Sequence, residues 1–159
     1  MDPLTQVFNR RYFEQVAESE HSRARRNGAP LSLILLDIDH FKSFNDDHGH
    51  LVGDQVLTAV AKRTQDEVRK SDVLARFGGE EFVLLMPDTD LEPTKHKAEE
   101  IRLGIGELQI TVEGETVVSV NVSLDVANWT SEQSLNEALD QADKALYRAK
   151  ESGRNRTEV

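Results

Sequence analysis

The apolar run from Leu31 to Leu36 is the feature that most constrains how this chain can fold. It follows the turn residues Asn27-Gly28-Ala29-Pro30, is interrupted only by Ser32, and stops at Asp37. A short apolar run bounded by turn residues is typical of a central strand buried on both faces. The run is also far shorter than the roughly 20 residues of a membrane-spanning helix. We therefore expect a strand at the centre of a sheet that is covered on both sides.

The segments around this run predict further helices and strands. Asn9 can cap a helix that reaches about Arg26, and apolar periodicity predicts a helix from about Asp54 to Val68. The other expected elements are a short helix or turn at 41–47, strands at 73–76 and 82–86 around a turn at 77–80, a helix from Pro93 to about Gly104, a hairpin of 108–112 with 117–126, and a last helix capped by Ser134 and closed by Gly153. The order βααββαβ predicts an α/β (α+β) ferredoxin-like sandwich with a mainly antiparallel central sheet flanked by helices.

The composition fits a single domain and excludes several classes of function. The chain has 159 residues, of which 38% are hydrophobic, enough for one core. Its 29 acidic and 19 basic residues give a formal charge of -10, which argues against binding DNA, RNA or anionic membranes. Nucleotides remain compatible, because a divalent metal held by carboxylates supplies positive charge locally. With no cysteine there is no disulfide and no thiolate nucleophile, and we expect a cytoplasmic domain.

Two acidic clusters stand where neighbouring strands can bring them together. Asp37 and Asp39 end the buried strand, and Glu80 and Glu81 follow Gly78-Gly79 in the hairpin turn. Mg²⁺ prefers oxygen ligands and keeps positions open for phosphates, and paired metals suit in-line attack on phosphorus. Either cluster alone is as well explained by solvated acids at a turn, but the two together favour a metal centre. We expect Gly78 and Gly79 to adopt positive φ and to let a flat ligand approach the backbone.

The segment Phe77-Gly78-Gly79-Glu80-Glu81-Phe82 resembles the signature of the GGDEF family in its GGEEF form. Other blocks in family order resemble the family's remaining motifs: Asp2-Pro3-Leu4-Thr5 with Phe8-Asn9-Arg10-Arg11, Asp37 to Lys42 with Asn45, Gly49-His50 and Gly53-Asp54, and Ala142 to Lys150 with Gly153-Arg154-Asn155. The resemblance covers the chain and implies a fold similar to the palm of nucleotidyl cyclases. It also implies a diguanylate cyclase, which condenses two GTP into cyclic di-GMP and pyrophosphate with Mg²⁺, or Mn²⁺ as a substitute.

The resemblance assigns roles to individual residues. Asp37, Glu80 and Glu81 are the expected catalytic and metal-binding side chains, and the backbone carbonyl of Ile38 is a further metal ligand. Asn45 and Asp54 are expected to hydrogen-bond the guanine edge. The other expected substrate contacts are Phe41, Gly79 and the three cations of the triphosphate site, Lys42, Lys144 and Arg148.

A second expected site lies at Arg69 and Asp72. They match the family's RxxD inhibitory pattern at the family's spacing from Gly78, and the resemblance implies that they bind the cyclic di-GMP product. Because each domain would hold one GTP, catalysis implies a homodimer. We expect residues 1–159 to be one catalytic domain, excised from a longer protein with an upstream sensory or regulatory domain. A membrane-tethered parent is compatible with this sequence.

Two positions depart from the family pattern, since Gln6 and Asp125 both stand where it usually has glycine. Asp125 either adopts positive φ, which aspartate tolerates, or occupies space that close packing needs. The alternatives to a cyclase are a catalytically silent module that senses cyclic di-GMP through Arg69 and Asp72, and a GTP-binding regulatory domain. The intact acidic clusters favour the cyclase, because a retired enzyme has no physical need for buried, unpaired carboxylates.

Overall fold

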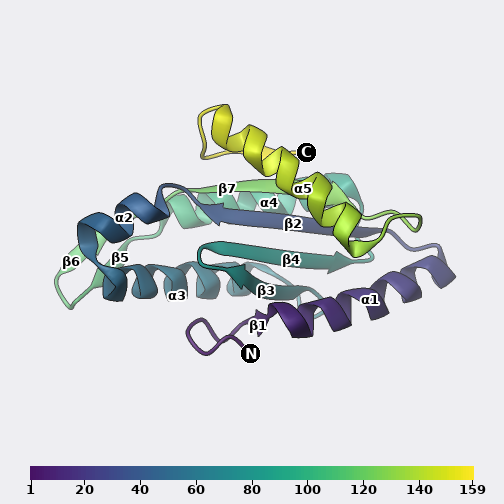
Figure 1. The fold of residues 1–159 in the computed structure, drawn as a ribbon, viewed down its shortest axis with the longest axis horizontal. Helices are drawn as coiled ribbons and strands as arrows, with labels where there is room; N and C mark the ends of the chain where they lie inside the picture. Colours follow the sequence, from purple (N-terminus) through teal and green to yellow (C-terminus); the bar gives the residue numbers. More distant parts are fainter.

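A computed structural model describes residues 1–159 and contains a six-stranded sheet with helices on both faces (Figure 1). The elements are β1 (Phe8–Asn9), α1 (Arg10–Asn27), β2 (Leu31–Ile38), α2 (Phe41–His48), α3 (His50–Glu67), β3 (Val73–Gly78), β4 (Glu81–Pro87), α4 (Leu91–Glu107), β5 (Ile110–Val112), β6 (Thr116–Val118), β7 (Val122–Asn128), α5 (Leu135–Glu151) and β8 (Thr157–Glu158). The strand order is β1-β3-β4-β2-β7-β8, with only the short β1 and β8 pairing in parallel. The predicted βααββαβ sandwich is confirmed.

Strand β2 is the centre of the sheet and is buried along its whole length, as predicted. It pairs antiparallel with β4 on one side and β7 on the other. Because side chains alternate along a strand, Ile34 and Leu36 join the core with α3 and α4, while Leu33 and Leu35 join the core with α1 and α5. Two apolar layers therefore hold β2 in place, and its C-terminal end is rigidly positioned.

The ends of the first and last helices are set by the predicted caps. The side chain of Asn9 accepts a hydrogen bond from the Tyr12 amide, and α1 ends at Gly28, whose φ is 66°. Ser134 and Glu137 form a reciprocal capping box at the start of α5. None of the helices combines the length and apolar character needed to cross a bilayer.

Two predicted boundaries are wrong. Helix α3 begins at His50, one turn before the expected Asp54. The expected strand 117–126 is two strands: β6 pairs with β5 in a small hairpin whose β5 lies against α3, and β7 enters the central sheet (Figure 1). The break lies at Asn121, whose carbonyl accepts the Asp39 amide at 2.9 Å. Two consecutive strands share one alternating pattern, so periodicity alone did not separate them.

Candidate active site

The two acidic clusters meet at one edge of the central sheet. Asp37 on β2 lies directly opposite Glu81 on β4, and the Ile38 amide donates to the carbonyl of Glu80 at 3.4 Å. In an antiparallel pair, the C-terminal end of one strand lies beside the start of the next. The end of β2 is therefore held against the turn that precedes β4, as the sequence predicts.

Asp37 is the most deeply buried carboxylate of this group, at 3% exposed. Burial raises its pKa to about 6, although the hydrogen bond and charge of Lys150 oppose the shift. Its Oδ2 accepts a hydrogen bond from the Lys150 ammonium, while Oδ1 is buried without any partner. A buried acceptor without a donor is costly, so the fold keeps open a position that a ligand can complete.

The neighbouring charges make the centre acidic overall. Burial raises the pKa of the Glu81 carboxyl, and the negative charge of Asp143 on α5 adds to that effect. Burial disfavours the charged form of Lys150, but the hydrogen bond to Asp37 and the negative charges of Asp37, Glu80 and Glu81 together outweigh this and raise the pKa of the ammonium. Asp37, Glu80 and Glu81 therefore face one lysine, and additional positive charge would stabilise the group.

The donors at this edge fit Mg²⁺ in kind. Carboxylates and the Ile38 carbonyl are hard oxygen ligands, and the unpartnered Oδ1 of Asp37 is free to coordinate a cation. No three His, Cys, Asp or Glu side chains surround a common point as a closed metal cage would. Mg²⁺ commonly uses one or two carboxylates and completes its shell with water and substrate phosphates. The residues thus fit an ion that is held jointly by protein and nucleotide.

Asp39 has a different role from Asp37. Its carboxylate accepts the Ser123 hydroxyl at 2.6 Å and the Asn155 amide at 2.9 Å. These bonds join the end of β2 to β7 and to the turn after α5. Because both oxygens have partners, Asp39 supports the geometry of the site and is not a candidate ligand.

The glycine turn before Glu80 is anchored by Arg76. The Arg76 guanidinium donates to the Gly79 carbonyl at 2.9 and 3.2 Å and to the Asp2 carboxylate at 3.4 Å. Neither Gly78 nor Gly79 has positive φ, so that expectation is wrong. A Cβ added at either would meet no atom within 4 Å. Packing within the folded chain therefore does not require glycine at either position, and the space over this backbone is open to a ligand.

The expected guanine contacts lie on two consecutive helices. The Oδ1 atom of Asn45 on α2 is buried without a hydrogen-bond partner. It lies against Gly53, where an added Cβ would come within 1.8 Å of it. Asp54, the next residue on α3, lines a groove of about 600 Å³ with Leu4 and Leu51. Asn45 does not itself line this groove, but its unsatisfied amide oxygen lies against Gly53, the neighbour of Asp54, and an amide and a carboxylate suit a flat heterocycle with polar edges.

Phe41 and Lys42 occupy the first turn of α2 and face different surroundings. Phe41 is buried in the core shared with α3 and α4, and its expected contact with a nucleotide stays a prediction. Lys42 is exposed. It is free to turn toward a phosphate without breaking another interaction.

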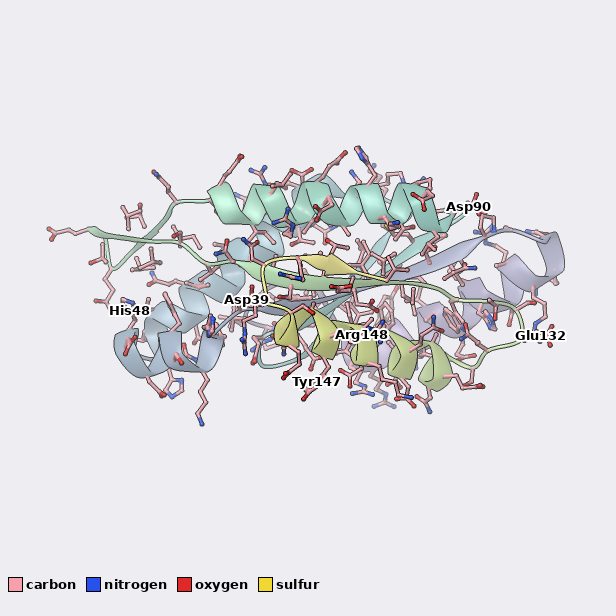
Figure 2. The ribbon with its side chains drawn as sticks, turned by 90° about the horizontal axis from the view of Figure 1, so that it is seen from above. Asp39, His48, Asp90, Glu132, Tyr147 and Arg148 are labelled. Carbon is pink, nitrogen blue, oxygen red and sulfur yellow. The ribbon has the colours of Figure 1, made fainter.

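The cations expected on α5 do not lie at the acidic centre. Lys144 and Arg148 line a cavity of about 400 Å³ together with Asp125. Arg148 donates to the Val159 carbonyl at 3.2 Å, beside the C-terminal strand (Figure 2). Their predicted contact with the triphosphate therefore stays a prediction.

Lys150 is the α5 cation that reaches the acidic centre, and it was not among the residues expected from the sequence. The sequence did carry a signal for this placement. The buried residues Ala142, Leu146 and Ala149 lie on the helix face that meets the sheet, and Lys150 is the next residue after them. Lys144 and Arg148 lie outside that buried stripe.

Arg69 and Asp72 lie at the opposite end of β3 from the glycine turn, roughly 20 Å away for six extended residues. The Arg69 guanidinium donates to Asp72 at 3.1 Å, to the Thr89 hydroxyl at 2.7 Å and to the Pro87 carbonyl at 3.2 Å. The side chain of Asp72 is 0% exposed and that of Arg69 is 54% exposed. Asp72 thus fixes a guanidinium whose remaining surface faces solvent.

Comparisons with known proteins agree with this architecture. The family model described as "Diguanylate cyclase, GGDEF domain" matches residues 1–156. The chain is 42% identical over 158 residues to the diguanylate cyclase DgcP of Pseudomonas aeruginosa, and 43% identical over 156 residues to the response regulator PleD of Caulobacter vibrioides. These alignments cover 99% and 97% of the chain but only 23% and 34% of the two relatives, so the chain spans about a quarter to a third of their lengths.

A solved structure of the GGDEF domain of DgcB from Caulobacter crescentus, in complex with cyclic di-GMP, superimposes with a TM-score of 0.93. It is 34% identical and covers 99% of this chain and 91% of that one. The match to the family model over almost the whole sequence, the shared fold and the glycine turn beside a buried carboxylate lead to one assignment. This chain belongs to the GGDEF family of diguanylate cyclase domains.

Proposed function

We propose that this domain condenses two molecules of GTP into cyclic di-GMP and pyrophosphate. The observation that carries the proposal is the buried Asp37 carboxylate, whose Oδ1 has no partner while Lys150 holds Oδ2. Glu80 and Glu81 lie across from it on a turn with open space above its glycines. A site of this kind can hold a metal and a triphosphate together.

Binding uses residues on three elements. Asn45 and Asp54 offer an amide and a carboxylate to the guanine edge, and Lys42 and Lys150 offer charge to the phosphates. Mg²⁺, or Mn²⁺ in its place, would be held by Asp37, Glu80 and the Ile38 carbonyl, and it would neutralise phosphate charge. Glu81 completes the acidic group from the opposing strand.

The reaction is a nucleotidyl transfer. The 3′-oxygen of one GTP forms a bond to the α-phosphorus of the other, and the bond from that phosphorus to the leaving pyrophosphate breaks. The hydroxyl proton passes to a base, for which Glu81 is the candidate because burial raises its pKa. A second transfer in the other direction closes the ring. The main contribution of the protein is to position the reactants and to stabilise charge.

Each domain contributes one nucleotide, so two copies must face each other as a homodimer. Product inhibition at Arg69 and Asp72 extends the proposal, since the half-exposed guanidinium can bind a guanine or a phosphate. The short span of this chain relative to its curated relatives supports an additional regulatory domain in a longer parent.

The test is GTP turnover with Mg²⁺, with products resolved by chromatography, on this domain fused to a dimeric coiled coil. Cyclic di-GMP should accumulate, Glu80→Ala should abolish it, and Glu115→Gln on the exposed β5–β6 turn is the charge-matched control. If the enforced dimer forms no product but still binds GTP or cyclic di-GMP, the cyclase proposal is wrong and the domain is a binding module.

A further inference from the structure

Asp125 in the middle of β7 forms no hydrogen bond with any other side chain of the chain. It is 0% exposed, and neither carboxylate oxygen has a hydrogen-bond partner. It holds a regular register opposite Leu35 and has no positive φ, so the left-handed alternative for this position is excluded. Its neighbours Leu124 and Val126 belong to the core with α3 and α4. Because strand side chains alternate, Asp125 points toward α5.

A cavity of about 400 Å³ lies between this part of β7 and α5, and Asp125 forms part of its wall. Gln133 before α5 contributes an amide, and α5 contributes the other polar side chains of the wall, Glu137, Asp140, Gln141, Lys144 and Arg148. The volume is in the range of small-molecule sites, which typically place a few polar groups at defined positions. The cavity is separate from the acidic centre, since it includes none of Asp37, Glu80 or Glu81.

The charges around Asp125 do not neutralise it. Burial raises its pKa to about 8, the Val126 backbone N–H and the attraction of Arg148 oppose the shift, and Glu158 and Asp143 repel its negative charge. The Arg148 guanidinium donates instead to the Val159 carbonyl. A group that brings positive charge and N–H donors would satisfy both oxygens of Asp125 and compensate its neighbours.

We propose that the cavity between β7 and α5 binds a small organic cation whose ammonium or guanidinium group pairs with the Asp125 carboxylate. Glu137 and Asp140 on α5 add attraction for the same charge. The oxygens of Asp125 are shielded from solvent, so the ligand reaches them by rotation of the long α5 side chains.

The probe is 1,4-diaminobutane, with guanidinium as a second cation, titrated into the ¹⁵N-labelled chain at pH 8. Saturable shifts are expected for the amides of residues 124–126 and 141–148. Asp125→Asn should weaken binding by about tenfold or more, since it removes a charge-assisted hydrogen bond. Glu115→Gln, which removes one acid far from the cavity, should leave the affinity unchanged. Lys144→Gln, which removes a positive charge from the cavity wall, should strengthen it.

Lowering the pH from 8 to 6 should weaken cation binding to the wild-type chain, because the Asp125 carboxyl must lose its proton to pair with the ligand. Three results would overturn the proposal: no saturable shift with either cation, equal affinity in the folded Asn variant, or stronger shifts of the same amides with inorganic phosphate. The last result would make the cavity an anion site held by Lys144 and Arg148.

Discussion

Lys150 on α5 forms an ion pair with Asp37 on β2, across 113 positions of sequence. The pair occupies one oxygen of the carboxylate and leaves the other without a partner. It thereby fixes the last turn of α5 over the end of the central strand. A bound nucleotide and its cation would compete with this ion pair, since the phosphates would attract Lys150 and the cation would attract Asp37. The ion pair therefore marks where triphosphate and metal would meet.

Replacing Lys150 with alanine should lower kcat/KM for GTP by about a hundredfold, the scale for losing one preorganised charged donor. Lys144→Ala removes the same charge from the same helix but away from Asp37, and it should cost no more than about threefold, as expected for an exposed cation. Steady-state kinetics of both variants in the dimeric fusion provide the measurement. A loss for Lys144→Ala as large as that for Lys150→Ala would instead support the triphosphate contact predicted for Lys144 from the sequence.

Gly79→Ala should fold normally and yet lose GTP binding. An added Cβ meets no atom of the chain within 4 Å, so the melting temperature should stay close to that of the wild type. The methyl group would occupy the space over the turn, and KM for GTP should rise by about tenfold or more, the scale of a misplaced substrate. The measurements are thermal melting and GTP kinetics.

Gly53→Ala is the contrasting variant. Its Cβ would come within 1.8 Å of the Asn45 amide oxygen, so the variant should lose about 1–3 kcal/mol of stability through overpacking. Urea unfolding measures this loss. Equal melting temperatures for the two glycine variants would contradict the assignment of one glycine to a ligand and the other to packing.

Arg69→Ala should leave the initial rate of turnover unchanged and relieve inhibition by accumulated product. Arg69 lies at the far end of β3 from the glycine turn, and half of its side chain is exposed. Asp72→Ala should in addition lower stability by about 1–3 kcal/mol, because the Arg69 amide loses its acceptor at 2.9 Å. Progress curves with added cyclic di-GMP separate the two effects. Undiminished inhibition in Arg69→Ala would remove the product-binding role.

The parts of the structure that were predictable from the sequence are those fixed by local chemistry. Burial of β2 follows from an apolar run between turn residues, and the ends of α1 follow from Asn9 and Gly28. The meeting of Asp37 with Glu81 follows from antiparallel pairing of two strands whose ends carry acids. Each of these depends on neighbours in sequence or on one pairing rule.

The parts that were not predictable depend on packing between distant elements. Lys144 and Arg148 lie four residues apart on one helix face, but the placement of α5 over the sheet turns Lys150 toward Asp37 instead. Glycine's tolerance of positive φ suggested that conformation for Gly78 and Gly79, whereas neither has positive φ and the structure shows open space over both. Helix orientation and free volume are tertiary properties, and sequence spacing does not determine them.

Gln6→Gly should raise stability by about 0.5–1 kcal/mol, because Gln6 has a φ of 64° in the left-handed region that glycine adopts without strain. The Gln6 side chain donates only one exposed hydrogen bond, to the Pro3 carbonyl, so little is lost with it. Urea unfolding of the variant gives the measurement. A drop in stability would show that this contact outweighs the backbone strain.

Asp125→Asn should stabilise the domain increasingly as the pH rises. Burial raises the pKa of the Asp125 carboxyl from 3.8 to about 8 in the folded state. Between these two values the unfolded chain releases this proton while the folded chain retains it, so ionisation favours unfolding. The group should lower the free energy of unfolding by up to about 1.4 kcal/mol per pH unit across that window. Arg148 moderates the effect, and Asp143 and Glu158 strengthen it.

The measurement is urea unfolding of the wild type and Asp125→Asn at pH 5, 6.5 and 8, because the difference cancels contributions from other groups. At pH 5 the two free energies of unfolding should be close, because the roughly 1.6 kcal/mol that the unfolded carboxyl has gained from ionisation is offset by the cost of the unpaired amide in the Asn variant. By pH 8 the Asn variant should lead by about 3–4 kcal/mol, since the amide cost does not change with pH while the ionisation gain keeps growing. Parallel pH profiles would mean that Asp125 finds a partner in solution and is ionised throughout. In that case the Asp125 carboxylate would already be paired with positive charge in the folded chain, and the cavity between β7 and α5 would not need a cationic ligand to satisfy it.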